Sequence, residues 1–394
     1  MTPRHVLTLN AGSSSLKFAV YREADTALEL SGQVSDLTGT PRLRARAGTE
    51  VVADEAWPTG QDLDAVLEGV FAWLERTGRA EAIIAVGHRI VHGGLTFRDP
   101  VVLTPDVIRE LRTLESLAPL HQPFNLRGVA RARHHFPDAV QVGVFDTAFH
   151  ADQPDVARLY ALPRALIDEG VLAYGFHGLS YDYIARTLRA DHGPAAGGRA
   201  IVLHLGSGAS LCAMADGRSV ATSMGFSALD GPPMSTRCGA IDPGIILYLI
   251  QSRGMSAEAV SDLLYNRSGL LGLSGESGDM VTLLASDHPH ARQALDVYVY
   301  RIAREIGSLA AALGGLDTVV FTAGVGEHAT PIRERIVDQC RWLGLELDAD
   351  ANQAHARRIS RPDSRVTVLV IPTDEQVVIA RGVAAISGQG GAGG

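Results

Sequence analysis

Residues 6–21 read VLTLNAGSSSLKFAVY, and the fold class follows from this stretch. Apolar and polar residues alternate over residues 6–9 and again over residues 16–21. Residues 10–15 between them are asparagine, alanine, glycine and serine, which as a group favour a turn. Alternation on both sides of such a turn predicts a β-hairpin with a long, hydroxyl-rich tip.

A similar unit recurs in the second half of the chain. Residues 202–214 read VLHLGSGASLCAM, again with Leu-x-Leu, a Gly/Ser tip and a Ser-Leu return. Two copies of one hairpin in the two halves predict a duplicated fold with a cleft between two lobes.

Short apolar strands alternate with helical patterns between and after these hairpins. This alternation predicts an α/β architecture. Strands are predicted at residues 82–86, 140–145, 318–322 and 366–371. Helices are predicted at residues 63–76, 105–117, 181–188, 291–313 and 374–386. Residues 223–244 are rich in glycine and proline without a period, which predicts an ordered functional loop.

The composition argues against several classes of protein. The 394 residues include 35 basic and 44 acidic side chains, a formal net charge of −9. Since nucleic-acid binding depends on neutralising phosphates, we expect no nucleic-acid partner. Cys212, Cys238 and Cys340 form no CxxC pair, which argues against a disulfide framework or structural zinc and favours a reducing cytoplasm. The most apolar stretch, residues 306–324, is interrupted by glycines and an aspartate, so we expect no membrane span.

Lys17 is the only lysine among the 35 basic residues. Where arginine fills almost every cationic position, a remaining lysine indicates a site that needs a compact point charge on a flexible stem. Backbone N–H groups, hydroxyls and an ammonium suit the terminal phosphates of a nucleotide, so the first hairpin tip is a candidate phosphate site. Lys17 follows a leucine, which excludes a Walker A loop, and no H-R-D or D-F-G string of protein kinases occurs.

Four further side chains are candidates for chemistry, each with a structural alternative. Arg89 suits bidentate binding of a carboxylate or phosphate, or an internal ion pair. Asp146 follows a predicted strand at the sheet edge where ligands bind, or caps the next turn. His177 stands between glycines in YGFHG, although a lone histidine is more often structural. Arg237 lies on the long loop.

Two strand–helix junctions complete the candidates. Residues 321–328, FTAGVGEH, predict a strand, a glycine turn and a helix start suited to a nucleotide. Residues 373–376, TDEQ, fit the T-x-x-Q capping box, with acidic residues favouring the helix dipole. A carboxylate at this junction could also hold magnesium through water.

Taken together, nine ordered segments resemble the acetate kinase family, in the superfamily of acetate and sugar kinases, Hsp70-type chaperones and actin. The resemblance runs from Leu7 to Arg381. The segments are residues 9–17, 87–94, 118–121, 145–150, 174–178, 204–208, 235–237, 321–327 and 373–375.

The resemblance implies a duplicated, two-lobed actin-like ATPase (ribonuclease H-like) α/β fold with an interlobe cleft. The first lobe would comprise residues 1–148 with 376–394, and the second, residues 149–375, would bind nucleotide. It also implies a homodimer formed largely by the second lobe.

The resemblance further implies an ATP:acetate phosphotransferase that gives acetyl phosphate and ADP with Mg²⁺ (or Mn²⁺). The catalytic residues would be Asp146, His177, Arg237 and Arg89. Acetate would meet Arg89, Val91, Leu120, His121 and Phe176. Asn10 and Glu375 would help to hold the metal. The nucleotide would meet Lys17, Ser13, Ser15, His204, Leu205, Gly206, Ser207, Gly208, Asp279, Met280, Val281, Gly324, Val325, Gly326, Glu327 and His328.

Several alternatives stay open. The family commonly has asparagine at the positions of Ser207 and His328 and arginine near that of Val281, so another phosphate donor is an alternative. Ala228 replaces a family proline, and the smaller side chain favours propionate activity beside acetate, with propionate kinase as the alternative. A binding module of the actin or Hsp70 type, without acyl transfer, is the alternative from another class.

Overall fold

The computed structural model describes residues 4–12, 15–37, 39–119, 121–193 and 197–390. The chain forms two compact units, each with its own β-sheet. Unit 1 comprises Met1–Ala151 and Asp374–Gly394, and unit 2 comprises Asp152–Thr373.

Unit 1 is built on an eight-stranded sheet of order β5-β4-β3-β2-β1-β6-β8-β7. β1 pairs antiparallel with β2, which confirms the first predicted hairpin, while β1, β6 and β8 run parallel. The strands are β1 (His5–Ala11), β2 (Leu16–Arg22), β3 (Leu28–Ser35), β4 (Arg42–Ala47), β5 (Glu50–Ala56), β6 (Ile83–Ile90), β7 (Val101–Val102) and β8 (Val140–Phe145).

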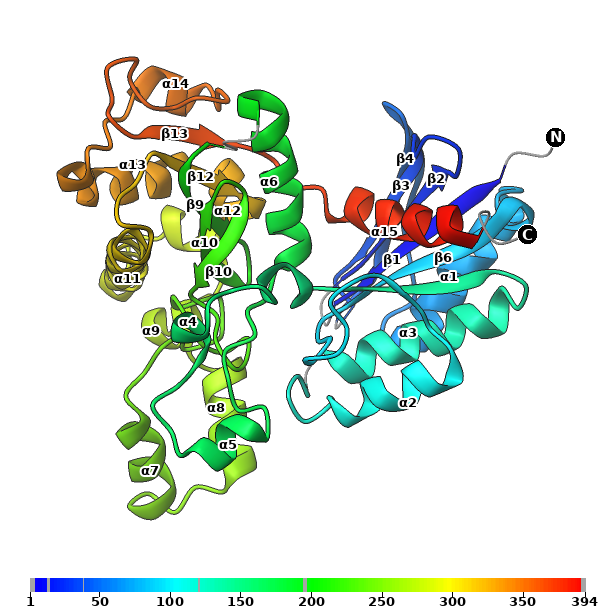
Figure 1. Cartoon of the computed structure of the whole chain (residues 1–394), viewed down its shortest axis with the longest axis horizontal. Coiled ribbons are helices and arrows are strands. Elements are labelled where there is room, and N and C mark those ends of the chain that lie inside the picture. Colours follow the sequence, from blue (N-terminus) through cyan, green and yellow to red (C-terminus); the bar gives the residue numbers. More distant parts are fainter. Residues whose placement is uncertain (1–3, 13–14, 38, 120, 194–196, 391–394) are drawn as a thin grey trace. The chain divides into compact units, whose positions relative to one another are not determined.

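Helices cover the two faces of this sheet (Figure 1). On one face, apolar residues of α1 and α3 join a large core with Leu7, Phe18 and Val34 of the strands. On the other face, α15 packs through Val377, Ala380 and Val383. The helices are α1 (Leu63–Arg76), α2 (Pro105–Thr113), α3 (Gln122–His135) and α15 (Glu375–Gly390), with short 3₁₀ turns η1 (Ala80–Ala82) and η2 (Ala148–His150).

Two glycines let α15 lie close to the sheet. A Cβ at Gly87 of β6 would lie 2.6 Å from Cγ2 of Ile379 and 2.7 Å from Cγ2 of Val383. A Cβ at Gly382 of α15 would lie 2.7 Å from Cγ2 of Val144. Real Cβ contacts are not this short, so these positions set the height of the helix above the strands.

Unit 2 is built on a five-stranded sheet of order β11-β10-β9-β12-β13. Its strands are β9 (Arg199–Leu205), β10 (Ala209–Ala215), β11 (Arg218–Thr222), β12 (Thr318–Thr322) and β13 (Thr367–Val370). Its helices are α4 (Asp155–Arg158), α5 (Arg164–Asp168), α6 (Gly178–His192), α7 (Pro243–Gln251), α8 (Ala257–Asn266), α9 (Gly269–Ser274), α10 (Met280–Ala285), α11 (Pro289–Leu313), α12 (Ala323–His328), α13 (Thr330–Gln339), η4 (Arg341–Leu343) and α14 (Ala349–Gln353).

The two sheets share one topology, which confirms the predicted duplication. In unit 1, β3, β2 and β1 are antiparallel neighbours, and β6 and β8 continue in parallel. In unit 2, β11, β10 and β9 are antiparallel neighbours, and β12 and β13 continue in parallel. The same hairpin therefore begins the same mixed α/β sheet twice.

Most predicted elements occur with shifted ends. The strands at residues 140–145 and 318–322 and the helix at residues 63–76 match β8, β12 and α1. β6 extends to Ile90, and α6 starts at Gly178 rather than residue 181. α2 ends at Thr113, four residues before the prediction. Residues 223–242 form no helix or strand, as expected for the long loop.

Two local predictions were wrong. The N-cap of α15 is Asp374 rather than Thr373, because the Asp374 carboxylate accepts the N–H of Val377. The expected glycine turn in residues 323–328 is instead the helix α12 itself. The chain makes this sharp change of direction at Ala323, whose φ of 64° lies in the left-handed region.

Within the described residues, no helix is both long enough and apolar enough to cross a membrane.

The close packing of α15 gives a stability prediction. We expect Gly87→Ala to destabilise the protein by about 1–3 kcal/mol, because the added methyl overpacks the contact with Ile379 and Val383. Chemical denaturation measures the change. Gly128→Ala in α3 is the matched control, since its Cβ would meet only the Cβ of Ala11, at 4.0 Å. That variant should be neutral or slightly stabilised, because alanine favours helix over glycine. Equal stability of both variants would contradict the proposed contact.

Candidate active site

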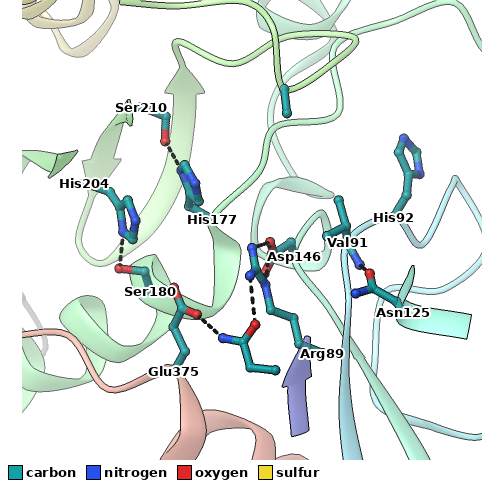
Figure 2. Close-up of polar contacts among 12 residues, drawn as sticks. Arg89, Val91, His92, Asn125, Asp146, His177, Ser180, His204, Ser210 and Glu375 are labelled. Atoms are coloured by element: carbon teal, nitrogen blue, oxygen red, sulfur yellow. Dashed lines mark hydrogen bonds and ion pairs between the residues drawn. The ribbon is translucent and has the colours of Figure 1, made fainter. Parts of the chain in front are cut away.

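Four polar side chains of unit 1 form a connected cluster, here named the Arg89 cluster: Asn10, Arg89, Asp146 and Glu375. Arg89 Nη2 donates to Asp146 Oδ2 at 2.5 Å, and Nε lies 3.0 Å and 3.1 Å from the two carboxylate oxygens. Arg89 Nη1 donates to Asn10 Oδ1 at 3.0 Å. Asn10 Nδ2 donates to Glu375 Oε2 at 2.7 Å. Figure 2 shows Arg89 facing Asp146.

The strand order explains why these residues meet. Asn10 lies near the end of β1, Arg89 near the end of β6, and Asp146 directly after β8. These three strands are parallel neighbours, so their carboxyl ends share one sheet edge, where open α/β sheets bind ligands. Glu375 reaches the same edge as the first residue of α15.

The Arg89 guanidinium is strongly held as a cation. Burial disfavours its charge, but the carboxylates of Asp146 and Glu375 outweigh that effect and raise the pKa of Arg89 above its usual value. Asp146 is itself 1% exposed. An arginine fixed in this way presents its remaining surface to an anion without reorganising.

The segment after β6 is clamped by α3. Asn125 Oδ1 accepts the N–H of Val91 at 2.9 Å, and its Nδ2 donates to the carbonyl of Ala11 at 3.0 Å. Gln122 accepts the N–H of His92 and donates to its carbonyl. Val91 is therefore buried and fixed two residues beyond Arg89. His121 precedes α3, whereas Leu120 lies outside the described residues.

In unit 2, two stacked histidines form a second cluster, here named the His177 cluster: His177, Ser180, Tyr181, His204 and Ser210. The two rings lie 4.1 Å apart between centroids, at 17°. His177 Nδ1 and the Tyr181 hydroxyl both meet Ser210 Oγ, at 2.7 Å and 2.5 Å. His204 Nδ1 meets Ser180 Oγ at 2.8 Å. Figure 2 shows both histidine–serine contacts.

His177 holds an uncommon backbone conformation. Its φ of 58° is left-handed, at the position that precedes α6. Such a conformation in a residue other than glycine costs on the order of 1–3 kcal/mol and is concentrated at functional sites. The ring is held in place by Ser210 and by the stack on His204.

Gly208 is the point at which the His177 and Arg237 side chains converge. A Cβ there would lie 3.4 Å from Arg237 Nη2 and 3.5 Å from His177 Nε2. Arg237 Nη1 donates to the carbonyl of Ala228 at 2.8 Å, which leaves a fixed guanidinium beside the glycine. Two cation-capable groups therefore lie at the turn between β9 and β10.

The predicted nucleotide segments of unit 2 lie near one another. Ser235 N–H donates to the carbonyl of Ser207 at 3.1 Å, and a Cβ at Gly278 would lie 2.6 Å from the Ser235 carbonyl. This brings together the turn at residues 204–208, the loop at 235–237 and the start of α10 at residues 279–281. α12, which carries residues 324–328, packs against β9. Val281 is 75% exposed.

A buried arginine supports α12. Arg333 is fully buried, and its Nη1 donates to the carbonyls of Gly326 and Glu327 at 3.1 Å and 2.7 Å. Its Nε donates to Asn352 Oδ1 at 2.8 Å. Glu327 Oε1 in turn accepts the N–H of Thr373, the last residue of unit 2. Arg333 thus fixes the segment that the sequence predicted to meet the nucleotide.

The first hairpin tip is only partly described. Lys17 of β2 is exposed and lies directly opposite Asn10 of β1 in the register. The carbonyl of Ser15 accepts the N–H of Gly12 at 2.9 Å. Ser13, also predicted to meet phosphate, lies outside the described residues.

Several supporting residues were missed by the sequence reasoning. These four residues occupy ordinary helix positions whose partners are 6 to 114 residues away, so no local pattern marks them: Asn125, Gln122, Ser180 and Arg333. Ser210 lies in the second hairpin, next to its Gly/Ser tip, and was the one position with a sequence signal.

Comparisons with known proteins agree with this arrangement. Residues 5–381 match the model of the acetokinase family. The acetate kinase of Rhodopseudomonas palustris (strain TIE-1) is 51% identical over 387 residues, covering 96% of this chain and 97% of the relative.

Solved structures give the same result. A propionate kinase from Francisella tularensis subsp. tularensis SCHU S4 superposes with a TM-score of 0.89 at 33% identity, covering 96% of this chain and 98% of that one. An acetate kinase from Porphyromonas gingivalis superposes with a TM-score of 0.85 at 36% identity, covering 98% and 100%. The sequence match, the duplicated sheet and the two clusters agree, and the chain belongs to the acetokinase family.

Proposed function

We propose that the chain catalyses the reversible transfer of the γ-phosphoryl group of ATP to acetate, giving acetyl phosphate and ADP. The observation that carries this proposal is the 51% identity to the Rhodopseudomonas palustris acetate kinase over nearly the full length of both proteins. The Arg89 and His177 clusters support it, because they supply the cations and hydrogen-bond donors that phosphoryl transfer to an anion needs.

The reaction is an in-line displacement. A carboxylate oxygen of acetate forms a bond to the γ-phosphorus, and the bond from that phosphorus to the β–γ bridging oxygen breaks, so that ADP leaves with the electron pair. A carboxylic acid with a pKa of about 4–5 is already ionised at pH 7 and needs no general base. Catalysis therefore consists of positioning and charge neutralisation.

Arg89 is proposed to bind the acetate carboxylate. The family resemblance implies that Val91, Leu120, His121 and Phe176 also meet the acetate. Asp146 serves to orient Arg89, since its carboxylate already accepts three close contacts from that guanidinium. Asp146 takes no proton in this scheme.

His177 and Arg237 are proposed to stabilise the transferring phosphoryl group. Burial raises the pKa of Tyr181 well above its usual value, so its hydroxyl stays protonated and can donate to Ser210. We propose that Ser210 donates to His177 Nδ1, so that the ring carries its proton on Nε2, the ring nitrogen beside Gly208. This tautomer offers an N–H to a phosphoryl oxygen.

The donor nucleotide is proposed to bind along the segments at residues 204–208, 279–281 and 324–328, with Lys17, Ser13 and Ser15 meeting its phosphates. Gly206 and Gly208 permit close backbone approach at the turn, which is closed by a hydrogen bond from Gly206 N–H to the carbonyl of Gly208. The preference for a nucleotide base, or for another phosphate donor, would depend on three positions: Ser207, Val281 and His328.

The donor set at Asn10 and Glu375 fits Mg²⁺ (or Mn²⁺). Mg²⁺ usually keeps several waters and binds through one or two carboxylates and the substrate phosphates. Glu375 offers one carboxylate beside an amide, and the described residues contain no group of three or more His, Cys, Asp or Glu side chains suited to a metal. The ion would neutralise charge on the phosphates when bound.

Propionate is the second candidate acceptor. The solved propionate kinase of Francisella tularensis matches this chain over 96% of its length, and Ala228 is smaller than the proline common in the family. One methylene separates substrates by only about 1–3 kcal/mol. We therefore expect acetate activity with measurable propionate activity.

The remaining proposals concern the oligomeric state, the lobe boundaries and the cellular location. A homodimer through unit 2 is supported by α7, an apolar helix with no buried residue, on which Leu247 and Tyr248 are 56% and 51% exposed. The two compact units support lobes at residues 1–148 with 376–394 and at residues 149–375. A cytoplasmic location is supported by three free cysteines.

Trapping of acyl phosphate with hydroxylamine tests the activity. We expect acetyl product in excess when the protein is given MgATP with acetate, propionate or butyrate in parallel. Propionyl product equal to or above acetyl product would favour a propionate kinase. Slow ATP hydrolysis with no acyl product from any acid would contradict phosphoryl transfer and favour an ATP-driven binding module.

Removal of Arg237 tests the phosphoryl-stabilising role. Arg237→Ala should lower kcat/KM by about a hundredfold or more, since a preorganised donor to the transition state contributes about 3 kcal/mol. Arg76→Ala, at an exposed position of α1, is the control and should keep full activity. The thermal midpoints of both variants must stay near that of the parent. Near-normal turnover of Arg237→Ala would show the assignment to be wrong.

Leu247→Glu tests the homodimer. A charge on the exposed apolar face of α7 should shift the protein from dimer to monomer in size-exclusion chromatography with light scattering. Leu28→Glu is the control, because Leu28 of β3 is similarly exposed, at 51% against 56% for Leu247, but lies in unit 1. An unchanged dimer in the Leu247→Glu protein would exclude α7 from the interface.

A further inference from the structure

The outward face of β2, β3 and β4 in unit 1 carries a pocket that the proposed reaction does not use, here named the basic pocket. Its volume is about 400 Å³. The strand register places Lys17 opposite Gln33, and Gln33 opposite Arg44, in one row across the three strands. The lining residues are Lys17, Phe18, Ser31, Gly32, Gln33, Ser35, Arg44, Arg46 and Gln376.

Three cations line this pocket: Lys17, Arg44 and Arg46. Within the described part of the chain, none of the three forms an ion pair within 4.0 Å. Asp54 lies opposite Arg44 on β5, and its carboxylate accepts a hydrogen bond from Arg42 at 2.6 Å. The pocket therefore gathers positive charge in a protein whose net charge is negative.

Neutral polar groups complete the lining. Ser31, Gln33 and Ser35 of β3 contribute hydroxyl and amide groups to it. Gln376, the second residue of α15, also lines the pocket, and its amide nitrogen and oxygen are both buried without a hydrogen-bond partner. Leaving a buried amide without a partner is unfavourable, so a ligand that accepts a hydrogen bond from its nitrogen would stabilise the site.

We propose that the basic pocket is a second anion site, which binds a small molecule of the oligophosphate class. Several cations around one cavity favour a ligand with several negative charges, and guanidinium groups match phosphate oxygens as planar, bidentate donors. Arg44 and Arg46 lie on β4, two strands beyond β2 and roughly 10 Å farther from β1. They are thus directed to a separate ligand and not to the donor phosphates.

The site is coupled to the reaction through Lys17, a consequence that rests on the proposed function. Lys17 lines the basic pocket and is also proposed to meet the phosphates of the donor. An anion in the pocket competes for this one ammonium group. Occupancy should therefore raise the KM for ATP and leave kcat nearly unchanged.

Calorimetric titration with inorganic tripolyphosphate in metal-free buffer tests the site directly. The double variant Arg44→Gln with Arg46→Gln should bind tripolyphosphate at least about tenfold more weakly than the parent, because two charge-assisted contacts are lost. Arg42→Gln is the matched control: Arg42 lies on the same strand and is paired with Asp54 outside the pocket. The affinity of the Arg42→Gln protein for tripolyphosphate should stay within about twofold of that of the parent. Added salt should weaken tripolyphosphate binding to the parent and to Arg42→Gln alike.

Three outcomes would overturn the proposal. Equal affinity of all three proteins would exclude the arginines as ligands. Parent-like binding by the double variant, together with its loss in excess ADP, would assign tripolyphosphate to the nucleotide site instead. Co-sedimentation of the parent, but not of the double variant, with phosphatidylglycerol vesicles would assign the pocket to lipid headgroups.

The kinetic arm separates this inference from the proposed activity. Without tripolyphosphate, the double variant should form acetyl phosphate with the kcat and KM of the parent. When tripolyphosphate is present, the KM for ATP should rise for the parent and stay unchanged for the double variant. Absence of acetyl phosphate in every protein would contradict the activity and leave the binding result intact. Equal inhibition of parent and double variant would contradict the coupling.

Discussion

The ion pair of Arg89 with Asp146 is the interaction on which the organisation of unit 1 depends. It joins two parallel strands at their carboxyl ends, and Asn10 and Glu375 extend it to a third strand and to the C-terminal helix. Such a pair costs much in desolvation, so every lone pair and proton must find a partner. The cluster supplies several of these partners through contacts that span 57, 79 and 365 residues of sequence. The charge balance of this unit therefore depends on its strand order, which brings these residues together.

Unit 2 has a sheet of the same topology, but the segments that follow its strands differ from those in unit 1. Two of its parallel strands, β9 and β12, lead into glycine-containing segments, and His177 and Arg237 approach the turn at Gly208. The backbone conformations at His177 and Ala323, with φ of 58° and 64°, are strained for residues other than glycine. Packing around them offsets that strain: Ser210 and the His204 ring hold His177, and Arg333 holds α12 through two carbonyls. The two copies of the fold therefore differ at their strand ends. Unit 1 holds charged side chains there, in the Arg89 cluster, and unit 2 holds strained backbone at His177 and Ala323.

The basic pocket lies on the outward face of β2, β3 and β4 in unit 1. One face of the sheet is covered by α1 and α3, and α15 covers the part of the other face over β2, β1, β6 and β8. The strands beyond α15 keep an open, positively charged face. Lys17 lines this pocket and lies opposite Asn10 in the strand register, so its side chain can link the two regions.

The sequence by itself determined the α/β class, the two hairpins, most helix positions and the family, because each depends on periodicity or on contiguous motifs. It also selected Arg89, Asp146, His177 and Arg237, since glycine neighbours and strand ends are local signals. Only the tertiary structure decided which of these residues contact one another and which residues support them. Asn125, Ser180 and Arg333 stand in ordinary helical surroundings, and the cap of α15 shifted from Thr373 to Asp374 because packing sets where the helix begins. Contacts between distant residues follow from strand order and close packing, and neither is written in any local stretch of sequence.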